Sequence, residues 1–202
     1  LKKLLPSIKL LKKNFKNITI SVDTFWANTA KECIIAGANI INDISAGNID
    51  ENIFNVIAEF KTPYIIMHMQ GTPRVMQKNP KYDNVVNELV KFFDEKIKKL
   101  NNLGVHNIII DPGFGFGKTI QHNFQILNQL HRFKEFNLPI LIGASRKSMI
   151  YNLLETTAEN ALNGTSIVNT IALTNGANIL RVHDVKEANE CIKITTFAKN
   201  NS

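Results

Sequence analysis

Several polar side chains stand directly after short apolar runs of the sequence, where they could carry chemistry. They are two acids, an amide, a lysine and a cationic pair, namely Asp23, Asp111, Asn42, Lys147 and Arg181 with His183. A carboxylate can accept two parallel N–H bonds from a guanidine-like edge, while a lysine can donate to a carbonyl or a ring nitrogen. Such a set suits a flat heterocycle edged with donors and acceptors, such as a pterin or a purine.

Cationic residues among these positions suit an anion. The planar fork of arginine binds two oxygens of a phosphate or pyrophosphate at once, which makes Arg146, Arg181 and His183 candidates for such a ligand. No two histidines have the spacing of a zinc site, and Cys33 and Cys191 stand singly. The sequence therefore predicts two buried free thiols and no metal ion held by this chain's own side chains.

Several of these residues also have a purely structural interpretation. Asp23, Asn42 and Asp111 could cap the helices that follow their strands, which is an everyday role for such side chains. His68 could pack with a satisfied ring instead of contacting a ligand. The residue types alone leave both interpretations open.

The stretch from Ile109 to Thr119 reads IIDPGFGFGKT and ends like a loop that binds phosphate. A nucleotide P-loop would need its first glycine at position 112, where Pro112 stands. The glycines at 113, 115 and 117 also depart from the dinucleotide spacing G-x-G-x-x-G. The sequence therefore predicts that this loop cradles no nucleotide phosphate.

Six short runs rich in isoleucine and valine are predicted to be strands. They cover residues 18–24, 38–44, 63–69, 107–113, 139–145 and 178–184. Because the runs are nearly continuous in apolar residues and do not alternate, both faces should be covered, as in the parallel sheet of an α/β fold. Helical patterns lie between them and end at Gly37, Gly104 and Gly176, where a left-handed cap is needed.

Alternation of strand and helix allows an open doubly wound sheet or a closed (β/α)8 barrel. The polar residues at the carboxyl ends of the runs favour the barrel, because a barrel gathers all such ends around one mouth. Six βα units are visible, whereas a barrel has eight and takes about 250 residues. We therefore predict a single domain, residues 1–202, that forms the C-terminal three quarters of an incomplete barrel lacking its first two units.

Composition limits the possible partners. The chain has 202 residues, of which 44% are hydrophobic, with a formal charge of +7 and a pI near 9.4. No apolar run is long enough for a membrane span and no secretory signal is present, so a soluble, cytoplasmic protein is predicted. The lysines concentrate at 1–17 and 91–100 in amphipathic helical patterns that place them on solvated faces. This placement argues against nucleic acid or a membrane surface as the partner.

Six motifs in this order and separation, SVDT, GANIINDI, MHMQGTP, DPGFGFGK, GASRKSMI and RVHDV, resemble those of the dihydropteroate synthases, pterin-binding (β/α)8 barrels of folate biosynthesis. The resemblance runs from about Pro6 to Cys191, nearly the whole chain. It implies a transferase reaction in which 4-aminobenzoate displaces pyrophosphate from 6-hydroxymethyl-7,8-dihydropterin diphosphate and gives 7,8-dihydropteroate. It also implies Mg²⁺ bound alongside the pyrophosphate.

The resemblance implies roles for individual residues. The pterin would be bound by Asp23, Asn42, Met67, Asp111 and Lys147. The pyrophosphate would be held by Arg181 and His183, and the 4-aminobenzoate pocket would be bordered by Phe116, Lys147 and Ser148. The catalytic residues would be Lys147, Arg181 and His183. The glycines of GFGFGK would let the chain turn tightly and present Phe116 to an aromatic ring.

In the family, the first two barrel loops supply an Asn that contacts the metal and the pyrophosphate, and a Thr-Arg pair that closes over the substrates. This sequence has neither loop, so the 202 residues alone are expected to have little or no synthase activity. The full-length protein is expected to be an active homodimer. Two alternatives stay open: a corrinoid-dependent pterin methyltransferase, which needs no pyrophosphate clamp, and a non-catalytic barrel fragment that stabilises a complementary chain.

Overall fold

A computed structural model describes residues 1–72, 76 and 80–201. The chain divides into two compact units, and each has its own buried apolar residues. The first unit comprises Leu1–His68 and Phe92–Ile110. The second unit comprises Met69–Lys91 and Asp111–Ser202.

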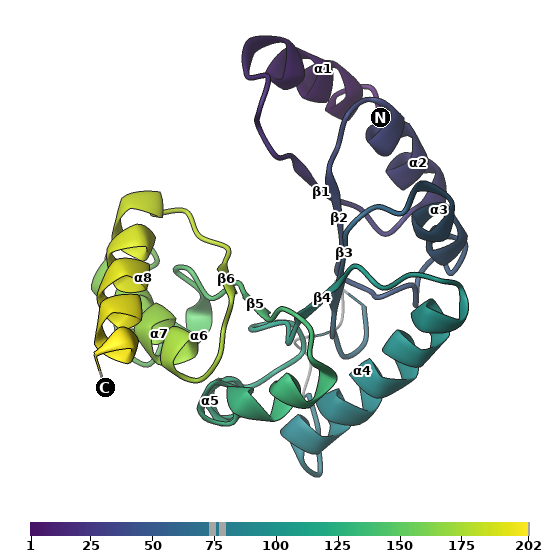
Figure 1. Ribbon diagram of the computed structural model, residues 1–202. Helices are drawn as coiled ribbons and strands as arrows, with labels where there is room; N and C mark the ends of the chain where they lie inside the picture. The colour runs from purple at the N-terminus through teal and green to yellow at the C-terminus, as the bar shows by residue number, and fades with distance from the viewer. Residues whose placement is uncertain (73–75, 77–79, 202) are drawn as a thin grey trace. The chain divides into compact units, whose positions relative to one another are not determined.

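The first unit is built from parallel strands with helices along one side (Figure 1). Its elements are α1 (Leu4–Asn14), β1 (Ser21–Asp23), α2 (Ala27–Ile35), β2 (Ile40–Asp43), α3 (Ile53–Phe60) and β3 (Tyr64–Met67), with most of α4 (Val85–Asn102) and β4 (Ile108–Asp111). The strand order is β1-β2-β3-β4. Parallel pairing places Ser21 beside Ile40 and Ile41 beside Tyr64.

β3 and β4 are covered on both faces, as their continuous apolar sequence predicted, whereas β1 exposes Ser21 and Asp23. Every residue of β3 is buried, and so is every residue of β4. The amphipathic helix α4 buries Phe93 and Leu100, whereas Lys98 and Lys99 on the same helix are exposed. The prediction of a solvated face is confirmed for these two lysines.

The second unit packs helices around one short pair of strands. Its elements are α5 (Ile120–Asn128), the 3₁₀ helix η1 (Leu130–Phe136), β5 (Leu141–Ile142), α6 (Ser148–Tyr151), α7 (Leu162–Thr174), β6 (Ile179–Leu180) and α8 (Val185–Asn200). β5 and β6 pair in parallel, with Leu141 beside Ile179. α7 and α8 lie side by side (Figure 1), and Cys191 Sγ on α8 donates to the Ser166 carbonyl on α7.

The predicted elements are confirmed in the described residues. Each of the six strands there lies inside one of the six predicted runs, and both cysteines are free and buried. The three glycines predicted to end helices do so in the left-handed region, with φ of +113° at Gly37, +74° at Gly104 and +114° at Gly176. Sequence periodicity and glycine punctuation were therefore sufficient for the alternation of strand and helix.

Helix starts differ from one of the sequence interpretations. A first-turn amide of α2 donates to Asp50 over 2.8 Å, so Asp50 rather than Asp23 meets that helix end. α5 begins with a capping box, in which Thr119 Oγ1 accepts from the His122 amide and His122 Nδ1 accepts from the Thr119 amide. Thr119 rather than Asp111 therefore caps α5, and the capping interpretation of the strand-end acids is wrong at both helices.

Candidate active site

Asp23 and Asn42 lie side by side at the carboxyl ends of β1 and β2. The parallel register pairs the two residues directly, and Asn42 Nδ2 donates to Asp23 Oδ1 over 2.8 Å. Asp23 is exposed, whereas Asn42 is only 3% exposed. The Oδ1 atom of Asn42 is buried and has no hydrogen-bond partner in the part of the chain that the structure describes. A buried acceptor without a hydrogen bond costs about 1–3 kcal/mol of stability. The pair therefore presents an oxygen that a ligand could satisfy, beside the Asp23 carboxylate.

The neighbouring residue, Asp43, fixes the loop that follows Asn42. Its buried carboxylate accepts from Ser45 N at 2.8 Å, Ser45 Oγ at 2.7 Å, Gly47 N at 2.7 Å and the Tyr64 hydroxyl at 2.6 Å. Burial, together with the nearby charge of Asp43, raises the pKa of Tyr64, so its hydroxyl stays a donor. Sequence reasoning missed this network; an acid within an otherwise apolar strand was the signal available.

Met67 and His68 lie at the carboxyl end of β3. Met67 is the last residue of the strand, and both side chains are buried. The His68 ring meets the Phe92 ring edge-on, with 4.9 Å between centroids. This contact supports the packing interpretation of His68.

In the second unit, Asp111 and Lys147 are close enough that the charge of each shifts the pKa of the other. Asp111 is buried at the end of β4 and accepts from the Gly113 amide over 2.8 Å. Burial raises the pKa of Asp111, and the charge of Lys147 is the largest influence that lowers it again. Burial likewise lowers the pKa of Lys147, while Asp111 opposes that change. An acid and an ammonium thus share a weakly hydrated environment, where their interaction is stronger than in water.

Lys147 is also tied to the glycine-rich loop. Its Nζ donates to the Phe114 carbonyl over 2.6 Å and lies 4.6 Å from the centre of the Phe116 ring. Gly115, between the two phenylalanines, has φ of +81°, a conformation that favours glycine. The turn at Gly115 therefore lets Phe114 offer its carbonyl and Phe116 its ring to the same ammonium.

Lys118 is a site residue that sequence reasoning did not identify. Its side chain is 4% exposed, and Nζ donates to the Gly113 carbonyl over 2.9 Å and to the Phe116 carbonyl over 3.1 Å. Burial lowers the pKa of Lys118 to about 7, against the opposing influence of Asp111. The lysine therefore braces the loop from inside. In the sequence, Lys118 follows a Gly-x-Gly-x-Gly pattern like that of nucleotide-binding loops, in which a lysine binds phosphate and does not lie inside the loop.

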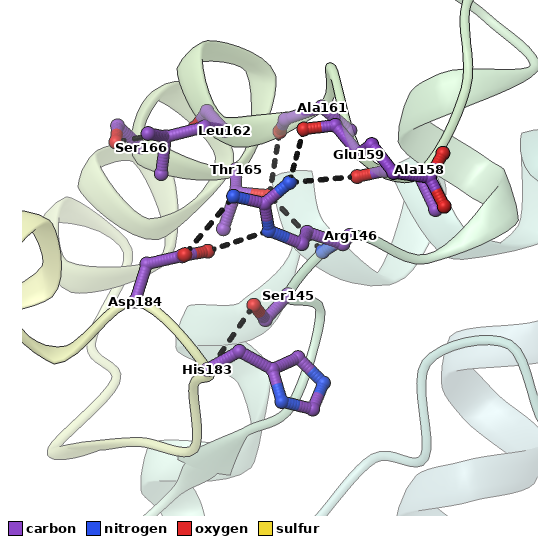
Figure 2. Close-up of polar contacts among 10 residues, drawn as sticks. All are labelled: Ser145, Arg146, Ala158, Glu159, Ala161, Leu162, Thr165, Ser166, His183 and Asp184. Atoms are coloured by element: carbon purple, nitrogen blue, oxygen red, sulfur yellow. Dashed lines mark hydrogen bonds and ion pairs between the residues drawn. The ribbon is translucent and has the colours of Figure 1, made fainter.

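Arg146 is held by protein acceptors (Figure 2). Its Nε and Nη2 donate to the two carboxylate oxygens of Asp184 over 2.8 and 3.0 Å. Its Nη1 donates to the carbonyls of Ala158, over 2.9 Å, and Glu159. Because each guanidinium nitrogen already donates within the protein, the expectation that Arg146 binds an anion is wrong.

The remaining predicted residues of the second unit follow β5 and β6. The Arg181 amide donates to the Ile142 carbonyl over 2.8 Å, and the His183 amide donates to Ser145 Oγ over 3.3 Å. The side chains of Arg181 and His183 are exposed, and exposed Ser148 begins α6. α6 has only four residues, so its end contributes little of the helix dipole that favours an anion at a helix N-terminus.

The residues predicted to hold the pyrophosphate are not of the kind that would hold the Mg²⁺ implied by the resemblance. Mg²⁺ prefers clustered oxygen ligands, whereas Arg181 and His183 offer nitrogen atoms. Across residues 1–72, 76 and 80–201, no three His, Cys, Asp or Glu side chains gather as metal ligands would. No catalytic step is therefore assigned to a metal ion.

Comparison with known proteins identifies the family. A family model described as pterin binding enzyme matches residues 1–183. The dihydropteroate synthase of Escherichia coli K12 is 40% identical over 206 residues, which covers all of this chain and 72% of that protein. The chain belongs to the dihydropteroate synthases.

Solved dihydropteroate synthases have the same fold. The Yersinia pestis enzyme, in a complex with a sulfonamide drug, matches with a TM-score of 0.95 and 36% identity over all of this chain and 74% of its own. The Xanthomonas albilineans enzyme, in complex with 7,8-dihydropteroate, matches with a TM-score of 0.90 and 32% identity over 98% of this chain and 73% of its own. The predicted α/β fold, an incomplete barrel of the pterin-binding type, is confirmed by these likenesses.

Dihydropteroate synthase membership also settles the class of reaction. The prediction of a transferase of folate biosynthesis is confirmed, and the likenesses favour it over the methyltransferase alternative. Within the described residues, no helix has both the length and the apolar character that crossing a bilayer requires.

Proposed function

We propose that this dihydropteroate synthase joins 4-aminobenzoate to 6-hydroxymethyl-7,8-dihydropterin diphosphate through the residues described above. The amine nitrogen forms a bond to the exocyclic methylene carbon while the bond from that carbon to the pyrophosphate oxygen breaks. Pyrophosphate leaves with the electron pair, and the amine loses one proton to solvent. No side chain is required as a nucleophile, because the aromatic amine attacks directly.

The unsatisfied oxygen of Asn42 carries the proposal for pterin binding. Its amide nitrogen is engaged by Asp23, so the buried Oδ1 is oriented as an acceptor. Nearby, the exposed Asp23 carboxylate is a second acceptor. A pterin edge with adjacent N–H groups would satisfy both residues, and a ligand that does so removes the penalty of the buried oxygen.

The second unit has groups of its own that are complementary to a pterin. Asp111 can accept from a pterin N–H group, and Lys147 can donate to its carbonyl or a ring nitrogen. Each of these two groups shifts the pKa of the other, so this acceptor and this donor lie in one neighbourhood. With Asn42 and Asp23 described above, buried Met67 completes the set proposed to contact the pterin.

We assign the leaving group to Arg181 and His183. Both side chains are exposed at the carboxyl end of β6, so an anionic ligand can reach them. Negative charge builds on the pyrophosphate as it departs, so donors fixed against it stabilise the transition state more than the ground state. Each such donor is worth on the order of 3 kcal/mol.

The second substrate is assigned to Phe116, Lys147 and Ser148. The Phe116 ring already lies against the Lys147 ammonium, which gives an aromatic surface next to a positive charge. 4-Aminobenzoate has a matching ring and carboxylate, and the Ser148 hydroxyl can donate to that carboxylate. Its amine would then face the pterin methylene.

Three further properties belong to the proposal. Mg²⁺ alongside the pyrophosphate is expected from the family alone. A homodimer is supported by the exposed apolar side chains of Ile194 and Phe197 on α8. A cytoplasmic location is supported by two cysteines that are both free and buried.

Calorimetric titration with two ligands tests the assignment. Arg181→Ala should weaken binding of the pterin diphosphate at least tenfold and leave binding of the bare 6-hydroxymethylpterin within about threefold, because only the first ligand carries the anion. Asn42→Leu should weaken both ligands equally, and Asn87→Leu, on the exposed face of α4, should weaken neither. Equal losses of the two ligands in Arg181→Ala would remove Arg181 from its role.

A further inference from the structure

Two loops of the second unit are joined by a forked ion pair. One loop follows β5 and carries Arg146 and Lys147, and the other follows β6 and carries His183 and Asp184. Both side chains of the Arg146–Asp184 pair are largely buried, with 23% and 21% exposed. The two parallel N–H···O bonds fix the relative orientation of both groups as well as their separation.

Arg146 is anchored to a third segment as well (Figure 2). Its Nη1 donates to the carbonyls of Ala158 and Glu159, just before α7. Its backbone amide donates to Thr165 Oγ1 over 3.0 Å, and that hydroxyl donates to the Ala161 carbonyl over 2.7 Å. The arginine thus connects its own loop to the start of α7 and to the loop after β6.

The backbone of Arg146 has a conformation that is unusual for a residue with a side chain. Its φ is +51°, in the left-handed region, which costs a residue with a side chain about 1–2 kcal/mol. Strain of this kind persists where surrounding contacts determine the conformation, and it concentrates at functional sites. Here the turn sends the Arg146 side chain to Asp184 and the next side chain, Lys147, to the Phe114 carbonyl.

His183 is fixed from both sides by the same arrangement. Its amide donates to Ser145 Oγ, and the following residue, Asp184, is gripped by Arg146. Asp184 stands at the N-terminus of α8 but makes no side-chain cap bond there. The hydrogen bond from Arg146 is the main cause that lowers the pKa of Asp184, so the acid is ionised at neutral pH.

We propose that Arg146 and Asp184 are positioning residues, which hold the loop bearing Arg181 and His183 at a fixed distance from the loop bearing Lys147. The inference rests on the proposed function, because those three side chains are assigned there to the substrates. The ion pair fixes the distance between the Lys147 ammonium, assigned to the pterin, and the Arg181 and His183 side chains, assigned to the pyrophosphate. Neither Arg146 nor Asp184 touches substrate in this scheme.

Binding measurements on Arg146→Lys and Asp184→Asn test the scheme. Each should weaken the pterin diphosphate about tenfold, while the bare pterin loses no more than about threefold, because Lys147 keeps its bond to the Phe114 carbonyl. The double variant should bind the pterin diphosphate no more weakly than the weaker-binding single variant, because either change alone breaks the Arg146–Asp184 ion pair. Arg132→Lys and Asp94→Asn, both at exposed positions, should bind as the unaltered protein does.

Amide hydrogen exchange of the ligand-free protein provides a readout that does not depend on the proposed function. Exchange at the His183 amide should be about tenfold faster in Arg146→Lys and Asp184→Asn, because its bond to Ser145 Oγ loses support, and the His68 amide should not change. Unchanged exchange at His183 would overturn the inference, as would additive binding losses or equal losses of the two ligands. Failure of the unaltered protein to bind the diphosphate would instead count against the proposed function.

Discussion

The Asp23–Asn42 pair of the first unit and the Asp111–Lys147 cluster of the second reach their geometry in different ways. Register alone places Asp23 beside Asn42, and the pair leaves a buried oxygen without a partner. Loops place Lys147 and Lys118, and backbone carbonyls accept hydrogen bonds from both ammonium groups. The first region therefore offers an acceptor that needs a ligand, whereas the second holds charges whose pKa values are shifted by burial before any ligand arrives.

The largest effect expected in this comparison is the loss of Lys147. Lys147→Ala should weaken pterin binding by more than about a hundredfold, because it removes a half-buried charged donor. Leaving Asp111 without this partner should also cost about 1–3 kcal/mol of stability. Calorimetric titration and urea unfolding measure the two effects. Lys193→Met, on the exposed face of α8, should change neither, and near-normal pterin binding by Lys147→Ala would contradict the assignment.

A methyl group at Gly117 should disturb the loop that carries Phe116. At φ of +63°, an added Cβ would lie 2.7 Å from the Gln70 carbonyl oxygen, which is backbone and has little freedom to move. Gly117→Ala should lower the free energy of unfolding by about 3 kcal/mol, through backbone strain and overpacking together.

Gly104→Ala is the matched control for that substitution. Gly104 has a similar φ of +74°, but nothing lies within 4 Å of an added Cβ. This variant should lose only about 1 kcal/mol in urea unfolding. Equal losses at the two positions would mean that the loop around Gly117 gives way easily.

Lys118 should make the stability of the protein depend on pH. The pKa of this lysine is about 7 in the folded protein, whereas an unfolded lysine keeps its proton until a pH near 10.4. Between these values the unfolded chain binds more protons, so the contribution of Lys118 to stability rises with pH. It stays constant well below pH 7, where Lys118 is protonated in both states. Over pH 7 to 9 this rise should be on the order of 2 kcal/mol.

Urea unfolding of Lys118→Met at several pH values measures that contribution. Methionine is of similar length and has no proton to exchange, so the rise attributed to Lys118 should disappear. Asp111 and Lys147 interact electrostatically with Lys118, so the difference between the two curves belongs to this coupled group. Parallel curves for the two proteins would show that Lys118 keeps its proton throughout.

Asn42→Leu should have the smallest effect on stability. It removes a buried oxygen that has no partner, while Asp23, which loses its donor, is exposed and can bond to water. The free energy of unfolding should stay within about 1 kcal/mol of the unaltered protein. A loss as large as that of Gly117→Ala would show that Asn42 supports the fold rather than a ligand.

The sequence was informative where local periodicity determines structure. Continuous apolar runs gave the strands, and the polar residues that end them include Asp23 and Asn42, which register brings together. The sequence was uninformative about contacts between a side chain and a partner far away along the chain. The choice of Asp184 by Arg146 and of Asp50 by α2 depends on segments 38 and 23 residues away, and no local pattern encodes such pairs.

Buried charge was the other limit of the sequence analysis. Lysine is almost never fully buried, so Lys118 gave no indication that it would lie inside its own loop. Asp43 raised the same difficulty, since an acid is expected at the surface unless its donors are known. Backbone carbonyls compensate Lys118, and two backbone amides with two hydroxyl groups compensate Asp43, and residue types do not reveal these partners.

The partnerless oxygen of Asn42 also bears on how the protein would choose between molecules of equal shape. A compound with an N–H group at that edge forms a hydrogen bond to Asn42 Oδ1. It also removes the free-energy penalty that the partnerless oxygen carries before binding. An isostere with a C–H group there leaves the oxygen buried against carbon and gains neither. Discrimination by hydrogen bonding of this kind is far steeper than discrimination by size, so replacing one atom of a pterin analogue should matter more than adding a methyl group elsewhere.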